Sequence, residues 1–184
     1  MKYLVTGMIC SGKSIFLDLA KEANYSVLKA DEIVAELYTD SQIIEKLKLK
    51  FSNYNFDGDV KETISNIFFT SKDNMDIIEE IIHPYVYLKI ETYMKNHKYI
   101  MVELPLLRNN IEYLLKHKTI YIDSEEEMRR DRFQKYRNKS LDYFNFLNNI
   151  QSENLEIKNK CDIIIKNNGS KDDLHREYKN KVVK

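Results

Sequence analysis

The segment GMICSGKS, from Gly7 to Ser14, constrains the fold of this chain more than any other stretch. It matches the pattern G-x-x-x-x-G-K-[ST], with the apolar run KYLVT before it and the helical spacing of SIFLDLAKE after it. Glycines let backbone N–H groups curl around an oxyanion, the lysine reaches the outer phosphates, and the serine hydroxyl can bind Mg²⁺. The helix that follows adds its positive N-terminal end. A glycine-rich turn with an exposed lysine would not need this strand–loop–helix context, so the segment predicts a phosphate-binding P-loop.

The predicted nucleotide-binding residues of this loop are Gly7, Met8, Ile9, Cys10, Ser11, Gly12, Lys13, Ser14 and Ile15.

Strands and helices are expected to alternate along the chain. Strands are expected near residues 3–5, 25–30, 99–104, 118–123 and 162–166, with helices between them. This alternation predicts an α/β fold with a five-stranded, mainly parallel sheet flanked by helices. The stretch from about 31 to 97 is too long for one crossover, so we expect a helical subdomain there, and a lid region at about 125–150. Residues 1–184 are expected to form a single domain that carries the P-loop.

Composition narrows the class of protein. Lys+Arg 29 and Asp+Glu 29 cancel, so no bulk field attracts the chain to nucleic acid or to anionic lipid. Cys10 and Cys161 are far apart and have no Cys or His partners at metal-ligand spacing, which favours reduced thiols. No apolar run approaches the length of a membrane span. We therefore expect a soluble, cytoplasmic protein that binds neither nucleic acid nor membrane.

A second motif, NKCD at residues 159–162, spells the guanine-reading sequence of GTPases. It precedes an expected strand, whereas the GTPase motif follows one, and the chain has no D-x-x-G. The chain is also short for a large ATPase motor. These observations leave the small kinases.

Two carboxylates at strand ends suit a kinase. Ligands of open α/β sheets bind beyond the carboxyl ends of the strands, where Asp31 and Glu103 are expected. Asp31 is placed to accept the proton of an acceptor hydroxyl, and Glu103 to hold the Mg²⁺ shell through water, with Ser14 as the other metal-binding residue. The alternative is that Asp31 only caps a helix.

Over nearly its whole length the chain resembles the dephospho-CoA kinase family. The matching features, in order, are Thr6 before the P-loop, Asp31 in KADEI, His83 and Pro84 in IIHPYV, ELPLL at 103–107, Asp123 at a strand end, Arg132 in a lid helix, Gln151, and DIIIKNNG at 162–169.

The resemblance implies transfer of the γ-phosphate of ATP to the ribose 3′-hydroxyl of dephospho-CoA, which gives CoA and ADP. It implies that Asp31 is the general base, that Lys13, Ser14 and Mg²⁺ hold the triphosphate, and that Arg132 closes over it from the lid. The helical subdomain would receive the acceptor, and the stretch around Asn167 to Gly169 would lie near the adenine, with Asn168 and Gly169 as nucleotide-binding residues. The implied substrate-binding residues are Thr6, Asp31, His83, Glu103, Pro105 and Leu106.

The chain departs from the family pattern at Lys29, Met8, Cys10, Arg108 and Asn109. The family has an aspartate at the first of these positions, a glycine at the second and a small residue or glycine at the third. Lys29 is close enough in sequence to pair with Asp31 and lower its basicity. Two alternatives therefore stay open: another nucleoside or nucleotide kinase, and an ATP-binding protein of this fold that has lost transfer activity.

Two further readings stay open in helical segments. His83 could be structural or could contact substrate, and the proline after it is expected to kink or end its helix. The arginines 129, 130, 132 and 137 would ordinarily form a solvated helix face with Asp131 as partner. In a kinase lid, Arg132 alone is favoured as a phosphate clamp.

Overall fold

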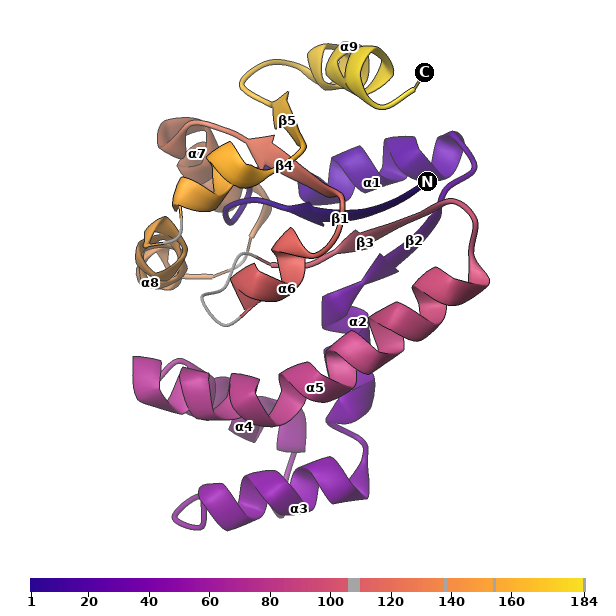
Figure 1. Ribbon diagram of the computed structural model, residues 1–184. Helices are drawn as coiled ribbons and strands as arrows, with labels where there is room; N and C mark the ends of the chain where they lie inside the picture. The colour runs from indigo at the N-terminus through magenta and orange to yellow at the C-terminus, as the bar shows by residue number, and fades with distance from the viewer. Residues whose placement is uncertain (106–109, 138, 154, 184) are drawn as a thin grey trace. The chain divides into compact units, whose positions relative to one another are not determined.

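The computed structural model describes residues 1–105, 110–137, 139–153 and 155–183 (Figure 1). The strands are β1 (Lys2–Thr6), β2 (Ser26–Lys29), β3 (Ile100–Glu103), β4 (Thr119–Asp123) and β5 (Ile163–Lys166). The α-helices are α1 (Lys13–Glu22), α2 (Ala30–Leu37), α3 (Ser41–Lys50), α4 (Val60–Phe68), α5 (Lys72–Asn96), α6 (Ile111–Leu115), α7 (Glu126–Tyr136), α8 (Leu141–Ser152) and α9 (Lys171–Lys181). A 3₁₀ helix, η2, spans Leu155–Lys160.

The five strands form one sheet in the order β2-β3-β1-β4-β5. β1 pairs in parallel with β3 on one side and with β4 on the other, and β4 pairs in parallel with β5. Four of the five residues of β1 are buried, as expected for the central strand of a sheet that is covered on both faces. The predicted α/β class and five-stranded parallel sheet are confirmed. The carboxyl ends of β1, β3 and β4 meet at one edge, and the P-loop leaves the sheet there.

Helices α1 and α9 pack on one face of the sheet (Figure 1). The α1 residues Phe16 and Leu17 are buried there with Tyr178 of α9. The Phe16 and Tyr178 rings meet edge to face at 5.2 Å, a favourable geometry for aromatic pairs. This packing fixes α1, and with it the end of the P-loop.

The chain divides into two compact units, one of Met1–Leu28 with His97–Lys184 and one of Lys29–Asn96. The second unit holds α2, α3 and α4, each of which contacts the long helix α5. Asp40 and Asp59 cap α3 and α4 by accepting hydrogen bonds from backbone N–H groups. Contrary to one expectation, α5 does not end at Pro84 but continues through it. No helix in the described ranges is both long and apolar enough to cross a membrane.

Helices α7 and α8 follow β4 and pack against each other through Phe133 and Phe144, whose ring centroids are 5.3 Å apart. Ser140 caps α8 by accepting from the N–H of Tyr143. The stretch between β4 and β5 ends in the 3₁₀ helix η2. The NKCD segment runs out of η2 toward β5, where the Asp162 carboxylate accepts from the backbone N–H of Thr119 at 2.7 Å. This aspartate therefore joins β5 to β4, as expected for a helix end that leads into a strand.

Candidate active site

The two glycines of the P-loop have backbone angles that require glycine. Gly7 has φ +148° and Gly12 has φ +99°, both in the region that side chains disfavour. A Cβ on Gly7 would lie 2.5 Å from the carbonyl oxygen of Ile122, and a Cβ on Gly12 would lie 2.1 Å from the Asn167 amide nitrogen. Both glycines allow a close approach of the loop to its surroundings.

Between the two glycines, Cys10 has φ +57°, the left-handed conformation, although it carries a side chain. Left-handed residues among right-handed ones turn successive backbone N–H groups toward one concavity, which binds anions. Cys10 and Gly12 give the loop this shape. Gly12 also stands at the N-terminus of α1, whose partial positive charge favours the same anion.

Four polar side chains form hydrogen bonds with backbone groups of the loop, and we call them the P-loop tether. The tether consists of Arg129 of α7, Arg132 of α7, Gln151 of α8 and Asn167 of the β5–α9 connection.

Two tether residues hold carbonyl groups in the middle of the loop. Arg132 donates from Nη1 to the Cys10 carbonyl at 3.5 Å, and Asn167 donates from Nδ2 to the Ser11 carbonyl at 2.7 Å. Because a trans peptide is planar, a hydrogen bond to a C=O also fixes the N–H of the next residue. The two bonds thus fix the peptide planes that lead into Ser11 and Gly12.

The other two tether residues hold both backbone groups of Ile9. Gln151 accepts from the Ile9 N–H at 2.6 Å, and Arg129 donates to the Ile9 carbonyl at 3.4 Å. Both side chains are 4% exposed. Arg129 also donates to the Ser124 carbonyl at 3.1 Å and to Oδ1 of Asn148 at 2.8 Å. The expectation that Arg129 belongs to a solvated helix face is wrong, because this guanidinium is buried against the loop and burial lowers its pKa.

Lys13 is the first residue of α1, and its ammonium group lies over the loop. Its Nζ donates to the carbonyl of Gly7 at 3.0 Å and to that of Met8 at 3.1 Å. Lysine is a mobile point charge on a flexible stem, so the same ammonium can move to phosphate oxygens that occupy the cavity.

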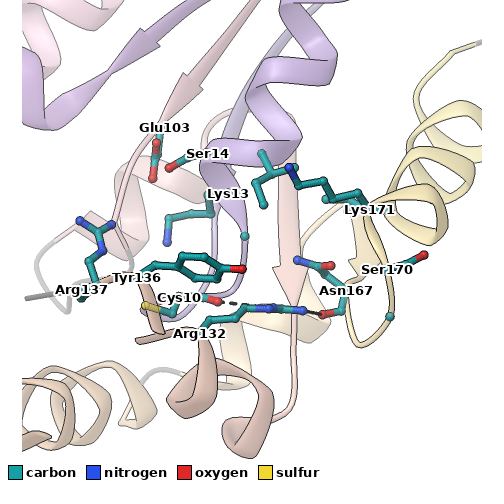
Figure 2. Close-up of a pocket in the computed structure, with 14 residues that line it drawn as sticks. Cys10, Lys13, Ser14, Glu103, Arg132, Tyr136, Arg137, Asn167, Ser170 and Lys171 are labelled. Carbon is teal, nitrogen blue, oxygen red and sulfur yellow. Dashed lines mark hydrogen bonds between the residues drawn. The ribbon is translucent and has the colours of Figure 1, made fainter. Parts of the chain in front are cut away.

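A cavity of 570 Å³ opens in front of the loop (Figure 2). Its volume is within the usual range for small-molecule sites. The lining residues are Cys10, Gly12, Lys13, Ser14, Ile15, Glu103, Arg132, Tyr136, Arg137, Asn167, Gly169, Ser170, Lys171 and Leu174. The structure thus brings together eight predicted residues, of which Arg132 comes from α7, Glu103 from β3 and Gly169 from the β5–α9 connection. Sequence reasoning missed Tyr136, Ser170, Lys171 and Leu174, which carry no motif of their own, and it named Asn167 only as part of the DIIIKNNG stretch.

Ser14 and Glu103 both line the cavity and supply oxygen atoms, the donors that Mg²⁺ prefers. Figure 2 shows both side chains at the same end of the cavity. No group of three or more His, Cys, Asp or Glu side chains that could hold a metal occurs in the part of the chain that the structure describes. The donor set therefore fits a Mg²⁺ ion that keeps waters and shares the phosphates, as is usual for this ion.

The Cys10 thiol faces the cavity beside Arg137. Burial raises the pKa of this thiol, and the charges of Arg137 and Lys13 oppose the shift without reversing it. The thiol is therefore protonated near neutral pH. Cys10 therefore acts as a small, neutral side chain of the loop.

The two cavity arginines of α7 differ in their partners. Besides the Cys10 carbonyl, Arg132 donates to the Asn167 carbonyl at 2.8 Å (Figure 2). It also donates to Oγ of Ser124 at 3.0 Å. Arg137, at the end of α7, is exposed and forms no ion pair with a carboxylate in the described ranges. Arg132 therefore has its donors directed at protein oxygens, whereas the charge of Arg137 faces the cavity without a carboxylate partner.

Several predicted residues lie outside this cavity lining. Gly7, Met8, Ile9 and Ser11 form the loop behind it, and Thr6 is fully buried with no hydrogen-bond partner for its hydroxyl. Asn168 was predicted near the nucleotide, but its amide pairs with Glu125 instead, accepting from the backbone N–H at 2.9 Å and donating to the carboxylate at 2.7 Å. The carbonyl of Pro105 accepts from Asn110 at 2.6 Å. Leu106 was predicted to bind substrate and lies outside the described residues, as do the departures at Arg108 and Asn109.

The remaining predicted residues belong to the helical unit. Asp31 is exposed in the first turn of α2. The pKa of Tyr38 is raised mainly by the burial of Tyr38 itself, and the negative charge of Asp31 adds to this shift. No ion pair joins Asp31 to Lys29 in the described ranges, so the structure gives no support to the expected pairing. His83 is half-buried in α5, beside the Tyr87 ring at 5.2 Å, and burial lowers its pKa to about 4. Its imidazole is neutral at pH 7.

Comparison with known proteins agrees with this geometry. The sequence model of the family described as dephospho-CoA kinase matches residues 4–173. A dephospho-CoA kinase of Campylobacter jejuni is 28% identical over 184 residues, covering 95% of this chain and 92% of the relative.

Two solved structures have the same fold over nearly the whole chain. A dephospho-CoA kinase structure from Campylobacter jejuni has TM-score 0.65 and 26% identity, with 96% of this chain and 94% of that chain covered. The structure of TT1252 from Thermus thermophilus has TM-score 0.80 and 23% identity, with 98% and 95% covered. The matched residues 4–173 include the P-loop and the whole helical unit. The chain belongs to the dephospho-CoA kinase family.

Proposed function

We propose that this protein transfers the γ-phosphate of ATP to the 3′-hydroxyl of the dephospho-CoA ribose, giving CoA and ADP. The observation that carries the proposal is a P-loop cavity with Lys13, Ser14 and Glu103 in its lining, in a chain of the dephospho-CoA kinase family. In the transfer, the ribose oxygen forms a bond to the γ-phosphorus while the bond from that phosphorus to the bridging oxygen of ADP breaks. We expect the reaction to take place in the cytoplasm.

The proposed role of the P-loop is to hold the phosphates of ATP. Backbone N–H groups of the loop and the N-terminus of α1 would bind phosphate oxygens, and Lys13 would leave its loop carbonyls for the outer phosphates. The adenine would lie toward Gly169 and the start of α9, at the other side of the cavity. Asn168 is a weaker candidate than Gly169, because its amide is already paired with Glu125.

Ser14 and Glu103 are the residues we propose for Mg²⁺, Ser14 through its hydroxyl and Glu103 through water. When bound, the ion would neutralise charge on the phosphates. The protein adds a fixed hydroxyl at the first turn of α1 and a carboxylate at the end of β3.

Asp31 is the proposed general base, which would take the proton of the 3′-hydroxyl as the oxygen attacks. It lies in the first turn of α2 and is exposed, so it is accessible to an acceptor. Pro105 and His83 are the other described residues proposed to contact the acceptor, whereas Thr6 is fully buried and would act only behind the P-loop. Because the pKa of His83 is lowered to about 4, it would act as a neutral hydrogen-bonding group and not as a cation.

We propose that Arg137 serves beside Arg132 as a cation for the transferred phosphate. Arg132 lines the cavity, but its guanidinium donates to three protein oxygens, those of Cys10, Ser124 and Asn167. Arg137 lines the same cavity beside Lys13 and is exposed, so its guanidinium is available to an anion. Loss of kcat in Arg137→Met with unchanged binding of ADP would support this role.

The test is an assay that couples ADP release to a spectroscopic signal, with ATP, Mg²⁺ and dephospho-CoA. A panel of nucleosides and nucleoside monophosphates is run beside it. We expect ADP release with dephospho-CoA and not with the panel. Release with a member of the panel alone would indicate another acceptor, and ATP binding without any release would indicate a protein that has lost transfer activity.

A further inference from the structure

The P-loop of this chain carries a side chain at a position where its backbone is left-handed. Cys10 has φ +57°, a conformation that costs a residue with a Cβ and costs glycine almost nothing. The residue lies in the middle of the loop and lines the cavity. An isolated loop with this sequence would tend to relax away from the shape that collects N–H groups around a phosphate.

The neighbouring peptide groups are held in place by buried side chains of α7 and α8. Gln151 accepts from the Ile9 N–H at 2.6 Å, and Arg129 donates to the Ile9 carbonyl at 3.4 Å. Both side chains are almost fully buried, so neither can exchange its partner for bulk water without a cost. They fix the peptide planes on both sides of Ile9, and the second of these planes leads into Cys10.

Arg129 is itself fixed by further buried hydrogen bonds, so its bond to the Ile9 carbonyl has a defined position. Its Nε donates to the Ser124 carbonyl and its Nη1 to Asn148, whose amide donates in turn to Glu126 at 3.2 Å. Ser124 directly follows β4, and Asn148 lies in α8. The guanidinium is thus fixed to the sheet and to α8 before it reaches the loop.

We infer that Gln151 and Arg129 are positioning residues for nucleotide binding, which offset the left-handed backbone at Cys10 and keep the P-loop in its phosphate-binding shape. They act through Ile9 and do not themselves line the cavity. The inference rests on the proposed binding of ATP by this loop. It predicts an energetic coupling between Gln151 and the Cβ of Cys10, which a residue that only packs would not show.

The first experiment is a double-mutant cycle read by calorimetric titration with ATP and Mg²⁺. Gln151→Met keeps the length of the side chain and removes the acceptor, and it should raise the Kd for ATP about tenfold because the buried Ile9 N–H loses its partner. Gln151→Glu keeps an acceptor and should stay near wild type. Asn149→Met, an exposed position on the same helix, is the matched control and should have no effect.

The second half of the cycle changes Cys10. In the Gln151→Met background, Cys10→Gly should restore most of the lost affinity, because glycine needs no external hold at φ +57°. Cys10→Ala also removes the thiol but retains the Cβ, so it should not restore affinity. Equal Kd values for wild type and Gln151→Met would overturn the inference, and so would equal rescue by alanine and glycine.

Amide hydrogen exchange gives a test that needs no variant, in case Gln151→Met does not fold. The Ile9 amide of the wild-type protein should exchange slowly without ATP, because its hydrogen bond to Gln151 is buried. Exchange at the rate of an open loop would contradict the inference. Turnover of dephospho-CoA by the wild type is measured in the same series, so failure of the proposed activity is distinguishable from failure of the coupling.

Discussion

The P-loop and the helical unit Lys29–Asn96 are held in shape by different forces. Around the P-loop, buried polar groups bond to individual backbone atoms, as Gln151 and Asn167 do. In the helical unit, apolar residues on α2, α3 and α4 face α5, with side chains such as Leu47 and Ile64 almost fully buried. Hydrogen bonds fix direction, whereas apolar burial is non-directional and sets stability. Changes near the P-loop should therefore alter nucleotide binding, and changes in the helical core should alter unfolding.

The largest effect is expected at Asp31, the residue of the helical unit that is proposed to act as the general base. Asp31→Asn should lower kcat by about 10² to 10⁴-fold, because the 3′-hydroxyl loses its base. The Kd for ATP should be unchanged in calorimetric titration. Glu32→Gln changes the neighbouring exposed carboxylate of α2 and is the matched control, expected to keep wild-type kcat. Equal losses in the two variants would remove Asp31 from the proposed role.

Removing core volume from the helical unit should affect stability more than nucleotide binding. Leu47 of α3 is fully buried, so Leu47→Ala should lower the free energy of unfolding by about 2–5 kcal/mol. Urea unfolding measures the change, and ATP titration of the folded variant should give the wild-type Kd. A Kd for ATP raised tenfold with an unchanged free energy of unfolding would contradict the view that the helical core sets stability and not nucleotide binding.

The helical unit should also lose stability in acid because of His83. Its pKa in the folded protein is about 4, below the usual 6.5, so between these values the unfolded state binds more protons. Stability should therefore be fully present above pH 6.5 and fall as pH drops toward 4, by at most about 3 kcal/mol. Urea unfolding of wild type and His83→Gln across this range should show a shallower dependence in the variant. Parallel curves would indicate that His83 is not buried as described.

In the P-loop, Gly12→Ala should weaken binding of ATP about 10- to 100-fold, because alanine is strained at φ +99° and its Cβ meets Asn167. Gly58→Ala is the matched control, since nothing lies within 4 Å of a Cβ there. Titration with ATP distinguishes the two variants. Wild-type affinity in Gly12→Ala would show that the loop does not need its left-handed turn.

The smallest effect is expected at a surface ion pair of the helical unit. Lys89 pairs with Glu36, and both side chains are largely exposed. Lys89→Met should change the free energy of unfolding by less than about 1 kcal/mol, since exposed pairs contribute little. A loss as large as that of Leu47→Ala would contradict the view that apolar burial holds this unit.

The sequence was informative where a local pattern determines the backbone. The P-loop, the five strands and the helical character of residues 31–97 follow from glycine spacing and apolar periodicity, and Gly7 and Gly12 have the angles that the motif requires. The short helix α6 is only five residues long, and no residues were singled out for it within the stretch between β3 and β4. Pro84 was expected to disturb its helix, but the buried side chains on both sides of it, Ile82 and Val86, keep α5 continuous.

The tether could not be predicted, because it is made by tertiary contacts. Arg129 and Arg132 look alike in a charged helix, and only the packing of α7 against α8 shows that the first is buried. Gln151 was noted as a family feature, but its contact with Ile9 spans 142 residues of sequence. Asn168 was favoured over its neighbour Asn167, although Asn167 is the one that holds the loop.

We propose that the P-loop and Asp31 together phosphorylate the ribose 3′-hydroxyl of dephospho-CoA. Phosphorus NMR of the reaction with ATP, Mg²⁺ and dephospho-CoA, for wild type and Asp31→Asn, tests this proposal. We expect a new phosphomonoester resonance that grows in step with ADP in the wild type and is absent on the same timescale in the variant. ADP formation without a phosphomonoester on the acceptor, or the same rate in both proteins, would show that the proposed roles are wrong.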